Sequence, residues 1–345
     1  MSQARKTPTI QDVARFAKVS AATVSRALSS PERVSETTRA RISEAIHVTG
    51  YTLNQAARSL RQRSARTILV ALPDIRNPFF SAILDAIERE ATSRGYGVLV
   101  ANLYLGPQTA RRLQDYMLSN RADGLLLLDG SLSPDMLRTL TSPPYSVPLV
   151  VACEEIPNSN FHTVLTDNAN AAERATRHLL DLGHRRIGHI LGPEHNRVAQ
   201  DRLSGFTRAL ERAGQKLRPE WVFRGNFEMA SGFSAAARFM ALAERPTAIF
   251  AANDESAIGF LSGLRQHGLE CPRDISVVGF DDLGVTAHFT PPLTTMRQPR
   301  ETLGRMAAET LVDLLEETGL ARGPLRIVLN SELIVRESTG KPPEA

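Results

Sequence analysis

Near the amino end, hydrophobic positions repeat at the spacing of one helix face: Ile10, Val13, Ala14 and Ala17. Thr9 and Asp12 have the spacing of a capping box at the start of this helix. A second helix is predicted three residues further on, with Ser20 as its cap and with Val24 and Leu28 facing inward. Two short helices this close together are typical of a helix-turn-helix.

The other face of the second helix carries small or hydrogen-bonding residues around one arginine: Ala21, Ala22, Ser25, Arg26 and Ser29. Small residues let a helix enter the major groove, and an arginine can donate two hydrogen bonds to guanine. We therefore expect five residues to contact DNA: Ser20, Ala21, Ala22, Ser25 and Arg26. An ordinary αα-hairpin is the alternative interpretation.

A third helix completes a small domain. Ser35 can cap it, Gly50 can end it, and Ile42 and Ile46 supply apolar contacts. We expect a helix-turn-helix headpiece over residues 7–52. Residues 53–66 are polar and basic, so they form either a plain linker or a segment that orders on a polyanion.

From Thr67 onward, short apolar runs alternate with helical patterns, which predicts parallel sheets covered on both faces. The runs form two series: Ile68–Leu72, Val98–Ala101, Leu125–Leu128 and Leu149–Val151, then Ile187–Leu191, Val222–Phe223, Ala248–Ala251 and Ile275–Val278. The expected fold is therefore an all-α headpiece followed by an α/β core, residues 67–345, with two lobes. Lobe 1 is expected at about 67–162 and 298–325, and lobe 2 at about 163–297 and 326–340. Ligands of such sheets bind at the carboxyl ends of the strands, which makes the cleft between the lobes the expected site.

Charge is divided unevenly along the chain. Residues 1–66 carry twelve Lys or Arg against four Asp or Glu, a net charge of +8, whereas residues 67–345 carry 29 against 33, a net charge of −4. A basic segment around a helix-turn-helix pattern is typical of phosphate binding. Cys153 and Cys271 are expected to be buried thiols, and with no signal peptide or membrane-length apolar run we expect a cytosolic protein.

The sequence contains no nucleotide-binding glycine motif, no metalloprotease motif and no nucleophile elbow. His184 and His189 flank an apparent strand, where structural or surface roles are expected rather than metal binding. Asp254, Asp281 and Asp282 lie at strand ends without a partner nucleophile or metal set. We therefore expect no catalytic residues, no metal and no cofactor, and no enzyme activity.

Several motifs, in the same order, resemble those of the lactose/galactose repressor (LacI/GalR) family. They are Thr9–Ala14, Val19–Leu28, Ala57–Leu60, Asn77–Phe80, Gly183–Ile187, Arg202–Phe206, Ala252–Asp254, Ile275–Asp282 and Pro291–Thr295. The resemblance runs from about Thr7 to Val335. It implies a helix-turn-helix headpiece, a hinge and a two-lobed core like a periplasmic sugar-binding protein.

In that family the first residues of the recognition helix choose the operator sequence, and here these residues are Ala21 and Ala22. Two alanines offer only apolar contacts, so the resemblance makes Arg26 the expected guanine reader. The family's hinge orders on the operator and wedges a leucine into the minor groove. Leu60 matches that leucine, with Ala57 and Arg58 beside it.

The resemblance also implies a cleft for a small effector, at Phe79, Phe80, Arg202, Phe227, Asn253 and Asp281. Charged and aromatic groups of these kinds suit a sugar or a nucleobase. The alternatives are structural: one phenylalanine in the core, Arg202 paired with Asp201 at the surface, and Asp281 capping a turn. Residues 66–80 are most similar to the cytidine-repressor branch, which favours a nucleoside or pentose over a hexose or other carbohydrate.

Together these features favour a cytosolic, effector-controlled transcriptional regulator, most simply a repressor. One headpiece reads one half-site, so we expect a homodimer on a pseudo-palindromic double-stranded DNA operator and no membrane partner. An effector-dependent activator or a corepressor-dependent regulator of the same fold is the alternative. A sugar sensor whose headpiece contacts another protein is the rival from a different class.

Overall fold

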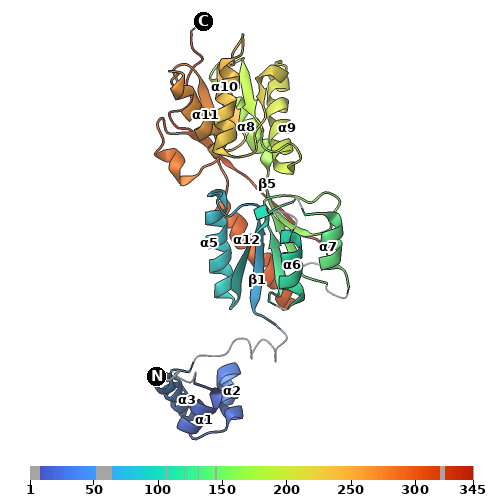
Figure 1. The fold of residues 1–345 in the computed structure, drawn as a ribbon, viewed down its shortest axis with the longest axis vertical. Coiled ribbons are helices and arrows are strands. Elements are labelled where there is room, and N and C mark those ends of the chain that lie inside the picture. Colours follow the sequence, from blue (N-terminus) through green and yellow to red (C-terminus); the bar gives the residue numbers. More distant parts are fainter. Residues whose placement is uncertain are drawn as a thin grey trace. The chain divides into compact units, whose positions relative to one another are not determined.

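The computed structural model describes residues 8–51, 64–105, 108–119, 121–130, 132–143, 146–318 and 323–344. Two compact units make up the chain, Met1–Ala65 and Arg66–Ala345 (Figure 1). The expected hinge residues Ala57, Arg58 and Leu60 lie outside the described residues.

The first unit is a three-helix headpiece. Its described elements are α1 (Ile10–Phe16), α2 (Ala21–Ser29), the 3₁₀ turn η1 (Pro31–Arg33) and α3 (Glu36–Thr49). Their apolar faces meet in one small core of Val13, Ala14, Ala17, Val24, Ile42 and Ala45. The predicted helix spacing is therefore confirmed. Gly50 ends α3 in the left-handed conformation, φ 65°, which glycine adopts without strain.

Lobe 1 of the second unit contains a six-stranded parallel sheet in the order β11-β5-β4-β3-β1-β2. Its strands are β1 (Thr67–Leu72), β2 (Gly97–Asn102), β3 (Gly124–Leu127), β4 (Leu149–Ala152), β5 (His162–Thr166) and β11 (Arg326–Leu329). Its helices are α5 (Phe79–Ser93), α6 (Gln108–Leu118), α7 (Pro134–Thr141) and α12 (Arg300–Glu316), and Leu103–Leu105 forms the 3₁₀ turn η2.

Lobe 2 contains a second six-stranded sheet in the order β12-β10-β9-β8-β6-β7. Its strands are β6 (Ile187–Ile190), β7 (Val222–Phe223), β8 (Ala248–Ala251), β9 (Ser276–Asp281), β10 (Thr294–Arg297) and β12 (Glu332–Ile334). Its helices are α8 (Asn168–Asp181), α9 (Arg197–Arg212), α10 (Met229–Met240) and α11 (Asp254–Gln266), with the 3₁₀ turns η3 (Pro219–Trp221) and η4 (Gly284–Ala287). The strand pairs are parallel except β10 with β12, which is antiparallel.

Alternation along the apolar strands gives each sheet two buried faces. In β1, Ile68, Val70 and Leu72 pack toward α5 and α12, whereas Leu69 and Ala71 pack toward α6 and α7. The sheet of lobe 2 has the same double cover, with α8 and α9 on one face and α10 and α11 on the other. The expected headpiece with a two-lobed parallel α/β core is confirmed.

The expected lobe boundaries need correction. We placed residues 163–166 and 326–329 in lobe 2, but β5 and β11 pair with each other in the sheet of lobe 1. The chain thus crosses between the lobes after β5, after β10 and between β11 and β12. Apolar sequence alone did not show which sheet each strand joins, because both sheets bury strands of the same character.

The buried polar groups of lobe 2 are mostly structural. His184 is fully buried and hydrogen-bonds to the hydroxyls of Thr247 and Ser276. His189 is also fully buried, and its ring stacks against the rings of both Phe206 and Phe250. A surface role is therefore wrong for both histidines. Cys153 and Cys271 are free thiols that are only partly buried.

We predict that Gly205→Ala destabilises the core. A Cβ at Gly205 on α9 would collide with the carbonyl oxygen of Ala169 on α8. Overpacking of this kind costs about 1–3 kcal/mol, whereas alanine in place of glycine would by itself stabilise an exposed helix by about 1 kcal/mol. Urea denaturation measures the net effect. Gly284→Ala is the control because its Cβ would meet no atom within 4 Å; a gain in stability at Gly205 would contradict close packing of α8 on α9.

Candidate functional site

The turn of the headpiece is held by backbone and side-chain hydrogen bonds. Lys18 takes a left-handed conformation, φ 52°, and Arg41 of α3 donates hydrogen bonds to the carbonyls of Ala17 and Lys18. Ser20 then caps α2, its hydroxyl oxygen accepting the Thr23 amide hydrogen at an N···O distance of 3.1 Å. These contacts fix the direction in which α2 leaves the turn.

A surface hollow on α2 brings together Ala21, Ala22, Ser25 and Arg26, four of the five predicted groove residues. The side chains of Ala22 and Arg26 are exposed. Ser20 differs from the other four, because its hydroxyl is used by the helix cap. The face is therefore small, polar and cationic, as an approach to a major groove requires.

A cavity of about 660 Å³ lies between the lobes of the core, and all six predicted effector residues line it. This volume suits a ligand of sugar or nucleoside size. The lining follows the carboxyl ends of strands in both sheets: Phe79 begins the helix after β1, Phe227 follows β7, and Asn253 follows β8. The two parallel sheets therefore place their ligand-binding ends at one cleft.

Arg202 of α9 lies at the centre of the wall formed by lobe 2, and its side chain is 5% exposed. Its Nε donates to Asn168 Oδ1 at 3.0 Å, its Nη1 donates to the carbonyl of Ala252, and its Nη2 lies 3.8 Å from Asp281 Oδ1. The guanidinium also stacks 3.7 Å from the centre of the Phe280 ring. Burial lowers the pKa of Arg202 to about 10, and the nearby carboxylates oppose that shift.

Asp281 is held at the end of β9 by an unusual backbone conformation, φ 122°. Its carboxylate accepts a hydrogen bond from Gln298 Nε2 at 2.7 Å. Burial raises its pKa to about 6, and the charge of Arg202 opposes that shift. The expected surface pairing of Arg202 with Asp201 does not hold, because Arg202 is buried facing Asp281, and Asp201 pairs with Arg197 at 3.1 Å.

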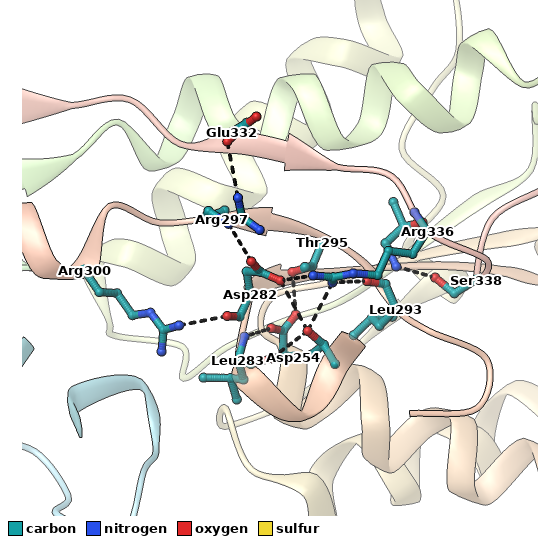
Figure 2. A network of polar contacts seen from close by, with 12 residues as sticks. Asp254, Asp282, Leu283, Leu293, Thr295, Arg297, Arg300, Glu332, Arg336 and Ser338 are labelled. Carbon is teal, nitrogen blue, oxygen red and sulfur yellow. Dashed lines mark hydrogen bonds and ion pairs between the residues drawn. The ribbon is translucent and has the colours of Figure 1, made fainter. Parts of the chain in front are cut away.

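Figure 2 shows a network of polar contacts around Asp254 and Asp282, which follow the cavity residues Asn253 and Asp281 in the sequence. Asp254 Oδ2 accepts the Leu283 amide hydrogen at 2.8 Å, and Thr295 donates to Asp254 Oδ1 at 2.6 Å. Asp282 Oδ1 accepts from Arg336 at 2.6 Å, and its carbonyl accepts from Arg300 at 2.8 Å. Burial raises the pKa of Asp254 well above its ordinary value, and the neighbouring Asp281 adds to the shift. Asp254 therefore orders the wall instead of facing a ligand.

The aromatic residues of the cavity are partly core residues. Phe79 and Phe80 are 8% and 7% exposed and pack edge to face, and they share a cluster with Leu283 from lobe 2. Phe227 has a left-handed backbone, φ 68°, and its carbonyl accepts from Asn253 Nδ2 at 2.9 Å. Asn253 also caps α11, so one amide positions both the helix and the Phe227 ring.

Three polar residues that line the cavity, Glu154, Asn196 and Glu255, are among those not predicted from the sequence. Glu154, after β4 of lobe 1, accepts from Asn196 Nδ2 of lobe 2 at 2.7 Å and from the Gly130 amide at 3.0 Å. Asn196 caps α9 through its Oδ1, and an asparagine ahead of a helical pattern is the signal that could have identified it. Glu255, in the first turn of α11, also lines the cavity.

The cavity is lined by groups that suit a small polar ligand. Within the parts of the chain that the structure describes, no group of three or more His, Cys, Asp or Glu could hold a metal ion. No helix in those same parts is long and apolar enough to cross a membrane. The cavity instead offers a buried cation, carboxylates, amides and aromatic rings around a space of effector size.

Comparison with known proteins identifies relatives over nearly the whole chain. Residues 9–54 match the model of bacterial regulatory proteins, lacI family, and residues 176–339 match that of a periplasmic binding protein-like domain. The HTH-type transcriptional repressor CytR of Escherichia coli (strain K12) is 38% identical over 331 residues, 96% of each chain. The transcriptional regulator CelR in its cellobiose complex is 32% identical, with a TM-score of 0.73 over 96% of this chain and 99% of that one. The lac repressor dimer bound to operator and the anti-inducer ONPF is 27% identical, with a TM-score of 0.85 over 97% and 100%.

A helix-turn-helix headpiece on a two-lobed, cavity-bearing core defines a DNA-binding transcriptional regulator and not an enzyme. The chain belongs to the lacI family of bacterial regulatory proteins.

We predict that Arg202→Met destabilises the protein by about 3–5 kcal/mol near pH 8, because it leaves the Asp281 carboxylate buried without its cation. Asp281 has a folded-state pKa above its ordinary value, so the folded protein binds its proton more tightly than the unfolded chain does. Loss of Arg202 raises that pKa further. The cost of the substitution should therefore shrink as the pH falls from 8 to 5.

Urea denaturation at both pH values measures this difference. Arg197→Met on the same helix is the matched control, since its partner Asp201 is partly exposed and such pairs contribute about 0–1 kcal/mol. An equal cost of Arg202→Met at pH 5 and pH 8 would contradict the assigned pairing.

Proposed function

We propose that this protein represses transcription by binding an operator through its headpiece, under the control of a small effector in the core cavity. The observation that carries the proposal is the joint presence of an exposed cationic α2 face and an effector-sized cavity lined by all six predicted residues. Its relative CytR is a transcriptional repressor, and the lac repressor relative binds an operator and an anti-inducer. A regulator of transcription works where the chromosome lies, so we place the protein in the cytoplasm.

In this proposal, α2 enters the major groove of double-stranded DNA. Ala21 and Ala22 lack hydrogen-bonding side chains and let the helix approach closely, so Arg26 supplies the main base contact. Ser25, Ser30 and Arg33 are the other polar residues of the hollow. The net charge of +8 in residues 1–66 adds phosphate attraction that is independent of sequence.

The hinge and the oligomer are further parts of the proposal. Leu60, with Ala57 and Arg58, would insert into the minor groove, where a leucine wedge kinks the duplex. One headpiece reads one half-site, which favours a homodimer on a pseudo-palindromic operator. The lac repressor relative is a dimer in its operator complex.

The effector is proposed to be a nucleoside, a pentose or another carbohydrate. Arg202, Asp281 and Asn253 supply polar contacts, and Phe79, Phe80 and Phe227 supply aromatic faces. A ligand that contacts both walls changes the balance between open and closed lobes only if it binds one state more tightly. The coupling to operator binding is expected to be about 1–3 kcal/mol, or about 5–150-fold in affinity.

We predict that Arg26→Ala weakens operator binding by about 10–100-fold, because it removes a bidentate guanine contact worth about 1–3 kcal/mol. An operator selected from a random duplex library with the wild-type protein serves as the probe in a mobility-shift assay. Arg15→Ala, which removes an exposed headpiece arginine on α1, should weaken specific and non-specific duplexes equally. Unchanged operator binding by Arg26→Ala would favour a headpiece that contacts protein instead of DNA.

We predict that Asp281→Asn removes the effector response but keeps operator affinity within about threefold, because Asp281 lies in the core cavity and not on α2. The operator complex is titrated with ribose, cytidine and cellobiose, and the change in operator affinity is measured for wild type and variant. An equal response in both proteins would place the effector elsewhere.

A further inference from the structure

The charges around the cavity are strongly unequal. Six carboxylates are among the described residues that line it, against two cations: Asp74, Asp129, Glu154, Glu228, Glu255 and Asp281 against Arg76 and Arg202. The carboxylates come from both lobes, and each lies at or shortly after the end of a different strand: β1, β3, β4, β7, β8 and β9. A ligand that enters therefore meets negative charge on every side.

Both cations already face protein carboxylates. Arg76 binds Asp74 through Nε at 3.0 Å and Nη2 at 2.7 Å, and its guanidinium lies over the Tyr104 ring at 4.4 Å. Arg202 is shared among Asn168, a backbone carbonyl and Asp281. A phosphate group is commonly bound by an arginine that donates two parallel N–H hydrogen bonds to it. Arg76 could do this only by breaking its bidentate contact with Asp74, and Arg202 only by breaking its buried contacts.

Glu255 is the carboxylate best placed to meet a ligand. It is half-buried in the first turn of α11, two residues after the cap Asn253. Glu255, Asp281, Asp74 and Glu228 line the same cavity. Burial raises the pKa of Glu255, and the charges of the other three carboxylates raise it further. Glu228 is engaged by Asn226 at 2.8 Å, and Asp74 by Arg76.

We propose that the cavity takes an effector that carries no negative charge, and that Glu255 accepts hydrogen bonds from its hydroxyl or amino groups while excluding its phosphorylated or carboxylated relatives. This inference rests on the proposed effector role of the cavity. A carboxylate has two oxygens that accept hydrogen bonds, which suits the neighbouring hydroxyls of a ribose or another sugar. A phosphate in the same position would add charge beside carboxylates in a partly desolvated site, where like charges are strongly unfavourable.

The test compares matched pairs by calorimetry on the full-length protein. The pairs are ribose with ribose 5-phosphate, glucose with glucose 6-phosphate, and cytidine with cytidine 5′-monophosphate. The uncharged member of the pair that binds should have an affinity at least about 100-fold higher than its phosphate. Glu255→Gln keeps the shape of the side chain and removes its charge, so it should lower this ratio by about tenfold or more. Glu211→Gln, exposed on α9 and outside the cavity, should leave the ratio unchanged.

The outcomes separate the inference from the function on which it rests. Two results would overturn the proposed exclusion of negatively charged ligands and leave the effector role of the cavity intact. One is a phosphate that binds as tightly as its uncharged partner or more tightly. The other is an unchanged affinity ratio in a Glu255→Gln variant that has the wild-type melting temperature. If Glu255→Gln melts early, Glu228→Gln provides the same test at a second cavity carboxylate of lobe 2. If none of the uncharged compounds and none of their phosphates bind, the effector role of the cavity is overturned, and the proposed exclusion of charged ligands falls with it.

Discussion

A buried guanidinium organises the core of this protein. Arg202 lies where α8, β8 and β9 meet, and it contacts one residue from each: Asn168, Ala252 and Asp281. A charge taken out of water is tolerated only when donors and acceptors around it are satisfied, so these three elements cannot shift independently. The position of the Asp281 carboxylate, and with it the wall of lobe 2, follows from that one requirement. Gln298 lies where the chain crosses to lobe 1 after β10, and its hydrogen bond to Asp281 extends this constraint toward lobe 1.

The fold class could be predicted because its helices and strands follow from local sequence patterns. Apolar runs such as 68–72 and helical spacing such as that of residues 10–17 are properties of neighbouring residues, and the structure reproduces them. The assignment of β5 and β11 to lobe 1 could not be predicted in this way, because it depends on the pairing of strands 163 residues apart. The antiparallel pairing of β12 with β10 could not be predicted from the sequence for the same reason.

The cavity was only partly predictable. Arg202 and Asp281 were identified through family motifs, but their mutual pairing, and that of Arg197 with Asp201, needed coordinates. Glu154 and Asn196 were missed because their hydrogen bond joins positions 42 residues apart, and neither residue is unusual in its local sequence. Short-range chemistry in the headpiece, such as the Ser20 cap, was predictable from spacing alone.

Asn196 couples the start of α9 to the contact between the two lobes, two features of the cleft that could otherwise vary separately. One amide caps α9 with its oxygen and joins Glu154 of lobe 1 with its nitrogen. A relative that replaces this asparagine with serine or aspartate could keep the helix cap, but it would lose the amide donor between the lobes. Divergence at position 196 should therefore alter how readily the cleft opens before it alters which molecules fit inside. The sensitivity of the regulator and its ligand preference would then evolve at different residues.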